Sequence, residues 1–227
     1  MNTPDPTPNP PSRGDATRAA LVQAAGEIFA RDGFHAASTR ELAQAAGVNQ
    51  ALIGYHFGGK DGLYRAVFED IVARIQERMG PLAASLETLL AEDPGGLDEA
   101  ARRERYLPAV LAIADRMLQL MLNPETLRWA QLILREQQQP TAAFEVLYSG
   151  YMGRMLGMLS SLVEKLRGDG DPERARLVVV GIVGQVLVWR AARAAVFRHL
   201  QWPELQPAHI ELARETVRRN VIALIFA

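Results

Sequence analysis

Residues 38–57 read STRELAQAAGVNQALIGYHF, which has the pattern of two short helices with a glycine between them. Ser38 followed three residues later by Glu41 is typical of a capping box, and it predicts that the first helix covers residues 39–46. Gly47 suits the left-handed backbone position that follows a helix end. A tight turn is therefore expected at this glycine.

The second helix is expected over about 50–57, because Asn49 is a favourable N-cap residue. Apolar side chains recur at helical spacing and are expected to face inward: Leu42, Ala43, Ala46, Val48, Leu52, Ile53 and Phe57. Two helices packed through a three-residue turn form a helix-turn-helix, whose second helix fits the major groove of DNA.

The polar side chains left on the outside suit this use. Arg40 and Gln50 are able to make bidentate contacts with base edges. Four other side chains suit phosphates: Thr39, Tyr55, His56 and Lys60. Helix corners also occur in proteins that bind no DNA, and residues 1–79 contain 8 Lys+Arg against 9 Asp+Glu, so charge alone gives no support. The expected DNA-binding residues are Thr39, Arg40, Asn49, Gln50, Ala51, Tyr55, His56 and Lys60.

The rest of the chain also has helical periodicity. Residues 16–31 form an apolar stripe before Asp32-Gly33, which predicts a helix-turn-helix domain over residues 15–60. From Asp61 a long helix begins, with a break or kink expected at Pro81. Further helices are expected over 98–122, from Pro124, from Pro140 to Leu166, over 173–199 and from Pro207 to the end.

One segment has an alternative interpretation. Residues 177–183 are rich in β-branched side chains and would suit a buried strand. No second segment of this kind is present to pair with it, and its flanks favour a helix. The predicted fold is therefore all-α, with a helix-turn-helix domain followed by a helical bundle over residues 61–227.

Composition excludes several classes of function. The net charge of −1 excludes a globally basic nucleic-acid binder, and the absence of cysteine excludes disulfides and thiolate metal sites. The four histidines lack metal-ligand spacing, and no catalytic set of side chains emerges, so no metal, cofactor or enzyme activity is expected. The longest apolar run, over 177–189, is too short to cross a membrane as a helix. The proline-rich residues 1–14 are expected to form a disordered tail without a secretory signal, and a cytoplasmic protein is expected.

Residues 17–68 resemble the DNA-binding domain of the TetR family of bacterial regulators. The matching residues are Ala24, Ala25, Phe29, Gly33, Phe34, Thr39, Leu42, Ala43, Ala46, Gly47, Val48, Tyr55, His56, Phe57, Lys60 and Leu63. The remainder is similar to the CecR-type subgroup, on Leu134-Arg135-Glu136, Pro140 and Gly184-Gln185. Members often have Ser, Thr and an aromatic residue where this chain has Asn49, Leu52 and Gly54, and Gly54 costs about 1 kcal/mol of helix propensity relative to Ala.

The resemblance implies that the C-terminal helices dimerise the protein and bind a small effector. Small residues on an apolar helix independently favour close approach of a partner helix, in a four-helix isologous interface. The expected interface residues are Val180, Gly181, Gly184, Leu187, Ala191, Val217, Val221 and Leu224. The effector candidates are Met117, Met121, Trp129, Arg135, Glu136, Met155, Gln185 and Trp189, although methionines at helical spacing also suit a plain core and Arg135 with Glu136 also suits a structural ion pair.

Together these features predict a homodimeric, ligand-responsive regulator that binds double-stranded DNA. A repressor released from a palindromic operator by a small molecule is expected. Two alternatives remain open at this point. One is a helical carrier or sequestering protein whose helix-turn-helix is vestigial, and the other is an all-α enzyme, which has no set of catalytic residues to support it.

Overall fold

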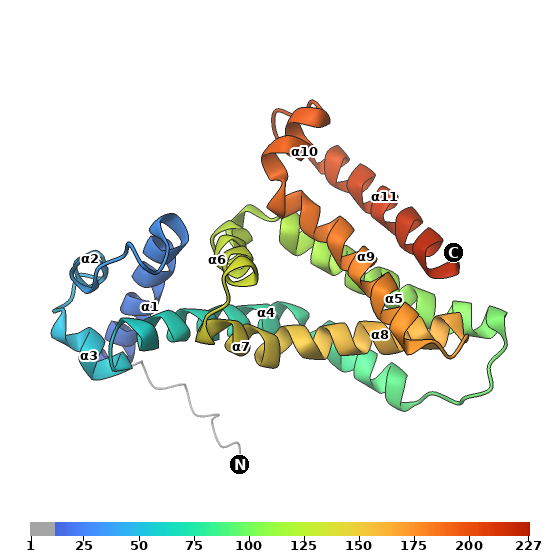
Figure 1. Ribbon diagram of the computed structural model, residues 1–227, viewed down its shortest axis with the longest axis horizontal. Helices are drawn as coiled ribbons and strands as arrows, with labels where there is room; N and C mark the ends of the chain where they lie inside the picture. Colours follow the sequence, from blue (N-terminus) through green and yellow to red (C-terminus); the bar gives the residue numbers. More distant parts are fainter. Residues whose placement is uncertain (1–11) are drawn as a thin grey trace, which may run out of the picture. The chain divides into compact units, whose positions relative to one another are not determined.

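The computed structural model describes residues 12–227, which are helical without any strand (Figure 1). They form two compact units that divide between Ile71 and Val72. Most of the expected tail lies outside the described residues. Its last part needs a correction, because α1 (Arg13–Asp32) already begins there: the Ser12 hydroxyl accepts a hydrogen bond from the Asp15 backbone N–H, and the Asp15 carboxylate accepts one from the Ser12 N–H.

The N-terminal unit contains α1, α2 (Thr39–Ala45), α3 (Ala51–Phe57) and the first part of α4 (Lys60–Ala91). Aromatic rings join α1 to α4, since Tyr64 packs edge-on against Phe29 with ring centroids 4.9 Å apart and against Phe68 at 5.0 Å. Fully buried side chains complete this core: Leu21, Ala25, Leu42, Ile53 and Leu63. These contacts extend the N-terminal unit beyond the expected boundary at residue 60.

The C-terminal unit contains the second part of α4 and all later helices. These are α5 (Glu99–Leu122), η1 (Pro124–Thr126), α6 (Leu127–Gln138), α7 (Ala142–Leu147), η2 (Tyr148–Met152), α8 (Gly153–Arg167), α9 (Pro172–Ala191), α10 (Arg193–His199) and α11 (Pro207–Phe226). The helix expected from Pro140 to Leu166 is thus interrupted by η2, a five-residue π-helix.

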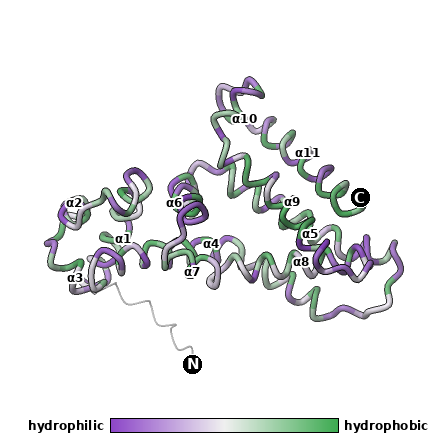
Figure 2. The backbone as a smooth tube through the Cα atoms, in the orientation of Figure 1, coloured by the Kyte–Doolittle hydropathy of each residue, from purple (hydrophilic) through white to green (hydrophobic). Residues whose placement is uncertain are grey.

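Four helices pack together in this unit: α5, α8, α9 and α11. Their shared core is made of apolar side chains that are fully buried: Val110, Ile113, Ala114, Leu162, Val163, Ile182, Val186 and Val221. Figure 2 shows that α9 is hydrophobic along most of its length. Residues 177–183 belong to this helix, so the helical interpretation of the β-branched segment is confirmed.

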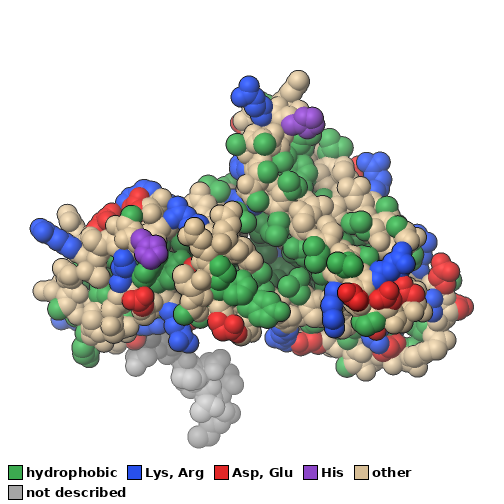
Figure 3. Space-filling model, in the orientation of Figure 1, with side chains coloured by type: hydrophobic (Ala, Val, Ile, Leu, Met, Phe, Trp, Pro, Cys, Tyr) green, Lys and Arg blue, Asp and Glu red, His purple; other side chains and the backbone are tan. Residues whose placement is uncertain are grey.

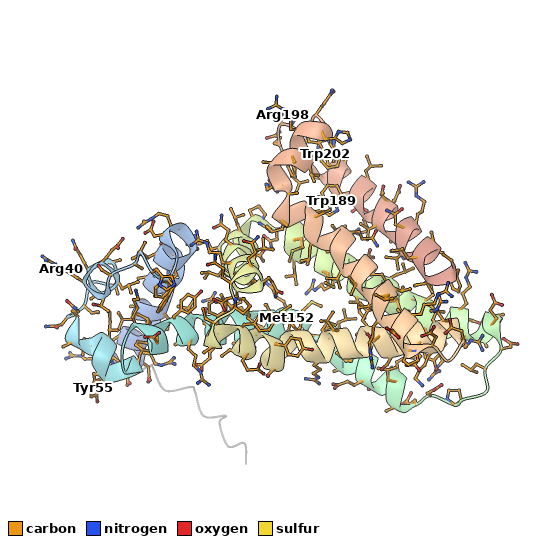
Figure 4. All side chains as sticks on the ribbon, in the orientation of Figure 1. Arg40, Tyr55, Met152, Trp189, Arg198 and Trp202 are labelled. Atoms are coloured by element: carbon orange, nitrogen blue, oxygen red, sulfur yellow. The ribbon has the colours of Figure 1, made fainter. Side chains whose placement is uncertain are left out.

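The structure differs from the expected helix bounds at two places. α4 continues through Pro81, so the break that was one of the two expectations there does not occur. The helix expected over 173–199 ends at Ala191, and α10 starts after a bend of 86°. The bend returns the chain so that Trp202 stacks on Trp189, with centroids 5.9 Å apart, and on His209 at 4.2 Å (Figure 4). Tertiary stacking therefore overrides the helix propensity of the alanines at this point.

Asp93 fastens the loop between α4 and α5 to the bundle. Its carboxylate accepts hydrogen bonds from Lys165 and from the Tyr106 hydroxyl, and from the Gly95 backbone N–H at 3.2 Å. The Lys165 bond, followed by those of Tyr106 and Gly95, lowers the pKa of Asp93 to about 2. The hydrogen bond with Asp93 in turn raises the pKa of Lys165.

Within residues 12–227 no individual helix is long and apolar enough to span a membrane, although the bent pair of α9 and α10 meets that criterion by length and composition.

Candidate nucleic-acid interface

Backbone hydrogen bonds define the turn between α2 and α3. The N–H groups of Gly47 and Val48 donate to the carbonyls of Gln44 and Ala43, at 3.1 and 3.0 Å, which is the Schellman pattern. Gly47 has a φ of 67°, as the sequence predicted for this position. The Asn49 side chain then accepts from the Ala51 N–H at 2.8 Å and caps α3. Asn49 therefore shapes the turn.

Only half of the expected capping box forms at the start of α2. The Ser38 hydroxyl accepts a hydrogen bond from the Glu41 N–H at 3.1 Å. The expectation that Glu41 reaches back to the cap was wrong, because its carboxylate pairs with Arg31 at 2.9 Å instead. This ion pair joins the end of α1 to α2.

The two helices present their polar side chains together. The Gln50 amide donates to the Thr39 hydroxyl at 2.8 Å, which places the start of α3 beside the start of α2. Arg40 is exposed on α2, and Tyr55 is 82% exposed on α3. Both side chains project outward from their helices in Figure 4. Arg40, Gln50 and Tyr55 are thus accessible on the two helices and the turn that joins them.

Lys60 requires a correction. Its ammonium donates to the backbone carbonyls of Phe34 and Ala37, at 2.8 and 2.9 Å, and lies 4.4 Å from the centre of the Phe34 ring. These contacts satisfy most of its hydrogen-bonding capacity inside the unit. Lys60 therefore holds the loop between α1 and α2 in place, and we remove it from the expected phosphate contacts.

A close backbone contact fixes the other end of α3. Gly58 ends the helix with a φ of 72°. A Cβ on Gly62 would lie only 1.8 Å from the carbonyl oxygen of Phe57, so only glycine fits there. The Phe57 ring lies 5.3 Å from the Arg18 guanidinium of α1. The orientation of the exposed helix is therefore set at both ends.

The effector candidates do not form one cluster. Met155 lines a cavity beside α4, whereas Trp129 packs under the Arg78 guanidinium at 4.8 Å. Glu136 needs a correction: its side chain is buried, and it accepts hydrogen bonds from the Thr141 N–H and hydroxyl, so it closes the turn between α6 and α7. The Trp189 ring stacks on the Trp202 ring of its own chain.

Gln185 differs from these residues, because both polar atoms of its amide are buried and have no hydrogen-bond partner in the described part of the chain. Met117 and Met121 are half-buried on α5, and Arg135 is exposed on α6. Of the candidates, Gln185 and Met155 thus retain the best case for contact with a small molecule.

Most of the expected interface residues are accessible on α9 and α11. Val180, Gly184, Ala191 and Leu224 are exposed, and Gly181 and Leu187 are half-buried. The interface prediction was wrong for Val217 and Val221, because both side chains are buried in the core of their own chain. Gly181 also serves a contact within the chain, since its Cβ would meet Leu224 at 3.4 Å.

Sequence reasoning missed four exposed apolar side chains on α9 and α11: Leu177, Val188, Leu212 and Phe226. The spacing of Leu177, Val180, Gly184, Val188 and Ala191 along one helical face would have identified the stripe. Figure 3 shows hydrophobic side chains over α9 and α11. In residues 12–227 no three histidine or acidic side chains gather as metal ligands would.

The fold and this surface define a helix-turn-helix protein with an all-helical C-terminal unit. The family model of bacterial regulatory proteins of the TetR family matches residues 21–67, and that of the C-terminal domain of the HTH-type transcriptional dual regulator CecR matches residues 109–227. The CecR protein of Shigella flexneri is 30% identical over 92% of this chain and 91% of its own length. The chain therefore belongs to the TetR family, with a CecR-type C-terminal domain, and it is a transcriptional regulator and not an enzyme.

Solved structures agree on the fold. A TetR-family transcriptional regulator from Streptomyces coelicolor aligns with a TM-score of 0.58 over 92% of this chain and 94% of its own, at 18% identity. The fatty acid degradation regulator FadR from Bacillus halodurans aligns with a TM-score of 0.55 over 96% of this chain and 97% of its own, at 16% identity. The resemblance inferred from the sequence is confirmed.

Proposed function

We propose that this regulator is a homodimeric repressor that leaves a palindromic operator when a small molecule binds its C-terminal unit. The observation that supports the DNA-binding part is the exposure of Arg40, Gln50 and Tyr55 on two short helices, which the hydrogen bond between Gln50 and Thr39 holds side by side. A guanidinium and an amide suit base edges, and a phenol suits a phosphate. Thr39, Ala51 and His56 complete the proposed contact residues.

Exposed apolar surface supports the dimer. Val180 and Leu177 are 67% and 66% exposed, and Gly184 leaves open space where a partner helix would approach. A contiguous exposed apolar stripe on a helix face favours association with a partner. Pairing α9 and α11 with their symmetry equivalents would give an isologous four-helix interface and two recognition helices at a fixed spacing.

The shared helix α4 supports coupling between ligand and DNA. Its first part belongs to the N-terminal unit and its second part to the C-terminal unit. A ligand that prefers one position of α4 would shift the population toward dimers whose recognition helices no longer match the operator. The ligand acts only through its differential affinity for the two forms.

Fluorescence anisotropy tests the DNA-binding part. The labelled probe is the intergenic DNA upstream of the regulator's own gene, since self-regulation is common in this family, and unrelated DNA serves as competitor. We expect saturable binding that survives the competitor and weakens steeply with salt, because phosphate contacts release counterions. Binding that the competitor abolishes at every salt concentration would contradict operator recognition in that fragment.

A carrier protein with a vestigial helix-turn-helix is the second candidate. The charge balance of residues 1–79 and the glycine at position 54 favour it. Such a protein would bind small molecules while showing no affinity for any DNA, so the salt titration separates the two functions.

A further inference from the structure

A cavity of about 330 Å³ lies between α4 and the π-helical turn that leads into α8, entirely within the C-terminal unit. The α4 wall includes Met79, Gly80 and Ala83, and the opposite wall includes Tyr151, Met155 and Met158. Its volume is at the lower end of the range of small-molecule sites.

Polar bridges hold α4 at both ends of this cavity. The Gln76 amide donates to the Gly150 carbonyl at 2.8 Å at one end. At the other, the Arg154 Nε donates to Glu87 at 2.8 Å. Between these two bridges α4 presents Met79 together with small residues, and a Cβ on Gly80 would meet no atom within 4 Å. The cavity is therefore bounded at each end by a polar contact between α4 and the opposite wall.

The π-helix at Tyr148–Met152 provides the opposite wall. The Gly153 N–H donates to the Tyr148 carbonyl, five residues before it. This π-helical hydrogen bond is rare in proteins overall, and where it occurs it is often found at a functional site. Gly150 lets this turn approach α4 closely, since a Cβ there would lie 2.9 Å from Val72 Cγ1. Tyr151 is thereby set into the cavity wall.

The Tyr151 hydroxyl is a donor without an acceptor. No hydrogen bond to it occurs among the described residues, and burial is the one cause that raises the pKa of Tyr151 to about 12. The phenol therefore stays protonated at every physiological pH. A ligand atom that accepts its hydrogen bond would give this hydroxyl the partner that it lacks among the described residues.

The other side chains that line the cavity disfavour a charged ligand and favour an aromatic one. The three methionines offer polarisable sulfurs, which contact ring edges favourably. The charged groups at the rim, Arg154 and Glu87, neutralise each other. An ionised ligand would find no unpaired countercharge and would lose hydration on entry.

We propose that this cavity binds a small neutral aromatic molecule whose carbonyl oxygen accepts a hydrogen bond from Tyr151. This inference rests on the proposed effector response, for which it names the site and the ligand class. Benzophenone is a suitable probe, because it has two rings and one ketone and because its light-activated ketone attaches covalently to nearby C–H groups such as those of methionine. Diphenylmethane has the same rings without the oxygen and is the matched ligand control.

Titration calorimetry of the full-length protein without DNA measures both ligands. Benzophenone is expected to bind saturably. Tyr151→Phe should weaken its affinity about tenfold, the loss of one hydrogen bond, while diphenylmethane binds both proteins equally. Tyr148→Phe, in the same turn but outside the cavity lining, should change neither affinity. Absence of saturable benzophenone binding, or equal weakening of both ligands by Tyr151→Phe, would overturn the proposal.

Irradiation followed by peptide mass spectrometry locates the site. We expect attachment at Met79, Met155 or Met158, and protection by excess diphenylmethane. Gly80→Leu should fill the cavity and abolish labelling, whereas Gly157→Leu, an equally open helical position outside the lining, should preserve it. Attachment confined to other residues would overturn the assigned site.

These measurements contain no DNA, so their failure leaves operator binding untouched. A protein that binds benzophenone at Tyr151 but no DNA would contradict the proposed function alone.

Discussion

At the residue scale, the cationic side chains of Arg40 and Lys60 have different roles. Arg40 is exposed on α2, whereas Lys60 is bound to the carbonyls of Phe34 and Ala37. An exposed guanidinium is free to meet DNA, while a lysine with two backbone acceptors stabilises the loop that it holds. This difference leads to a direct prediction for Lys60.

Lys60→Gln should lower the free energy of unfolding by about 1–3 kcal/mol, because two part-buried carbonyls lose their donor. The salt dependence of DNA binding should keep its slope, since no phosphate contact is removed. Urea denaturation and an anisotropy salt titration measure the two effects. A slope reduced by about one with unchanged stability would restore Lys60 to the phosphate contacts.

Asp93 predicts an acid-sensitive contribution to stability. Its pKa is about 2 in the folded protein against an ordinary value of 3.8, so the folded state holds this proton less tightly than the unfolded state. The contribution is present above pH 3.8 and is lost as the pH falls toward 2. Asp93→Asn should therefore destabilise the protein at neutral pH and flatten the pH dependence of unfolding in that window.

Thermal melts at several pH values test this prediction, with Glu92→Gln as the neighbouring control because its side chain is exposed. An Asp93→Asn melting temperature that follows the wild type from pH 2 to pH 7 would show that the carboxylate does not fasten the loop.

At the element scale, two glycines of the helix-turn-helix have opposite requirements. Gly62→Ala should cost about 1–3 kcal/mol, because its Cβ collides with the Phe57 carbonyl and the start of α4 must shift. Gly54→Ala should stabilise α3 by about 1 kcal/mol, because no atom lies within 4 Å of the added methyl group. Chemical denaturation gives the stability of the two variants, and hydrogen exchange of the α2 and α3 amides shows whether the change lies in these helices. Equal effects of the two substitutions would refute the close contact.

Local signals explain which elements were predictable. Ser38, Gly47 and Asn49 act on their own turn, so the sequence identified α2, the turn and α3 correctly. The bend after Ala191 depends on Trp202 stacking against Trp189, a contact between distant residues that no local pattern indicates. The fate of Lys60 and the cavity beside Tyr151 likewise depend on packing between separate helices.

At the scale of the whole molecule, the apolar stripe on α9 predicts the assembly. Val180→Asp should convert the proposed dimer into a folded monomer, because the side chain is exposed in one chain and would be buried in the proposed interface. Tyr148→Asp is the control, since Tyr148 is 45% exposed and belongs to η2 and not to the stripe. Light scattering after size-exclusion chromatography gives the masses. A Val180→Asp protein that remains dimeric would place the interface elsewhere.

Selection of binding sites from random DNA tests the central claim, which is sequence-specific recognition by a symmetric dimer through α2 and α3. The wild-type protein should enrich an inverted repeat, because two equivalent recognition helices read two half-sites. Arg40→Ala should lose preference at one position in each half-site, at a cost of about 1–3 kcal/mol. A wild-type pool without any repeated half-site, or an Arg40→Ala pool identical to it, would contradict the account.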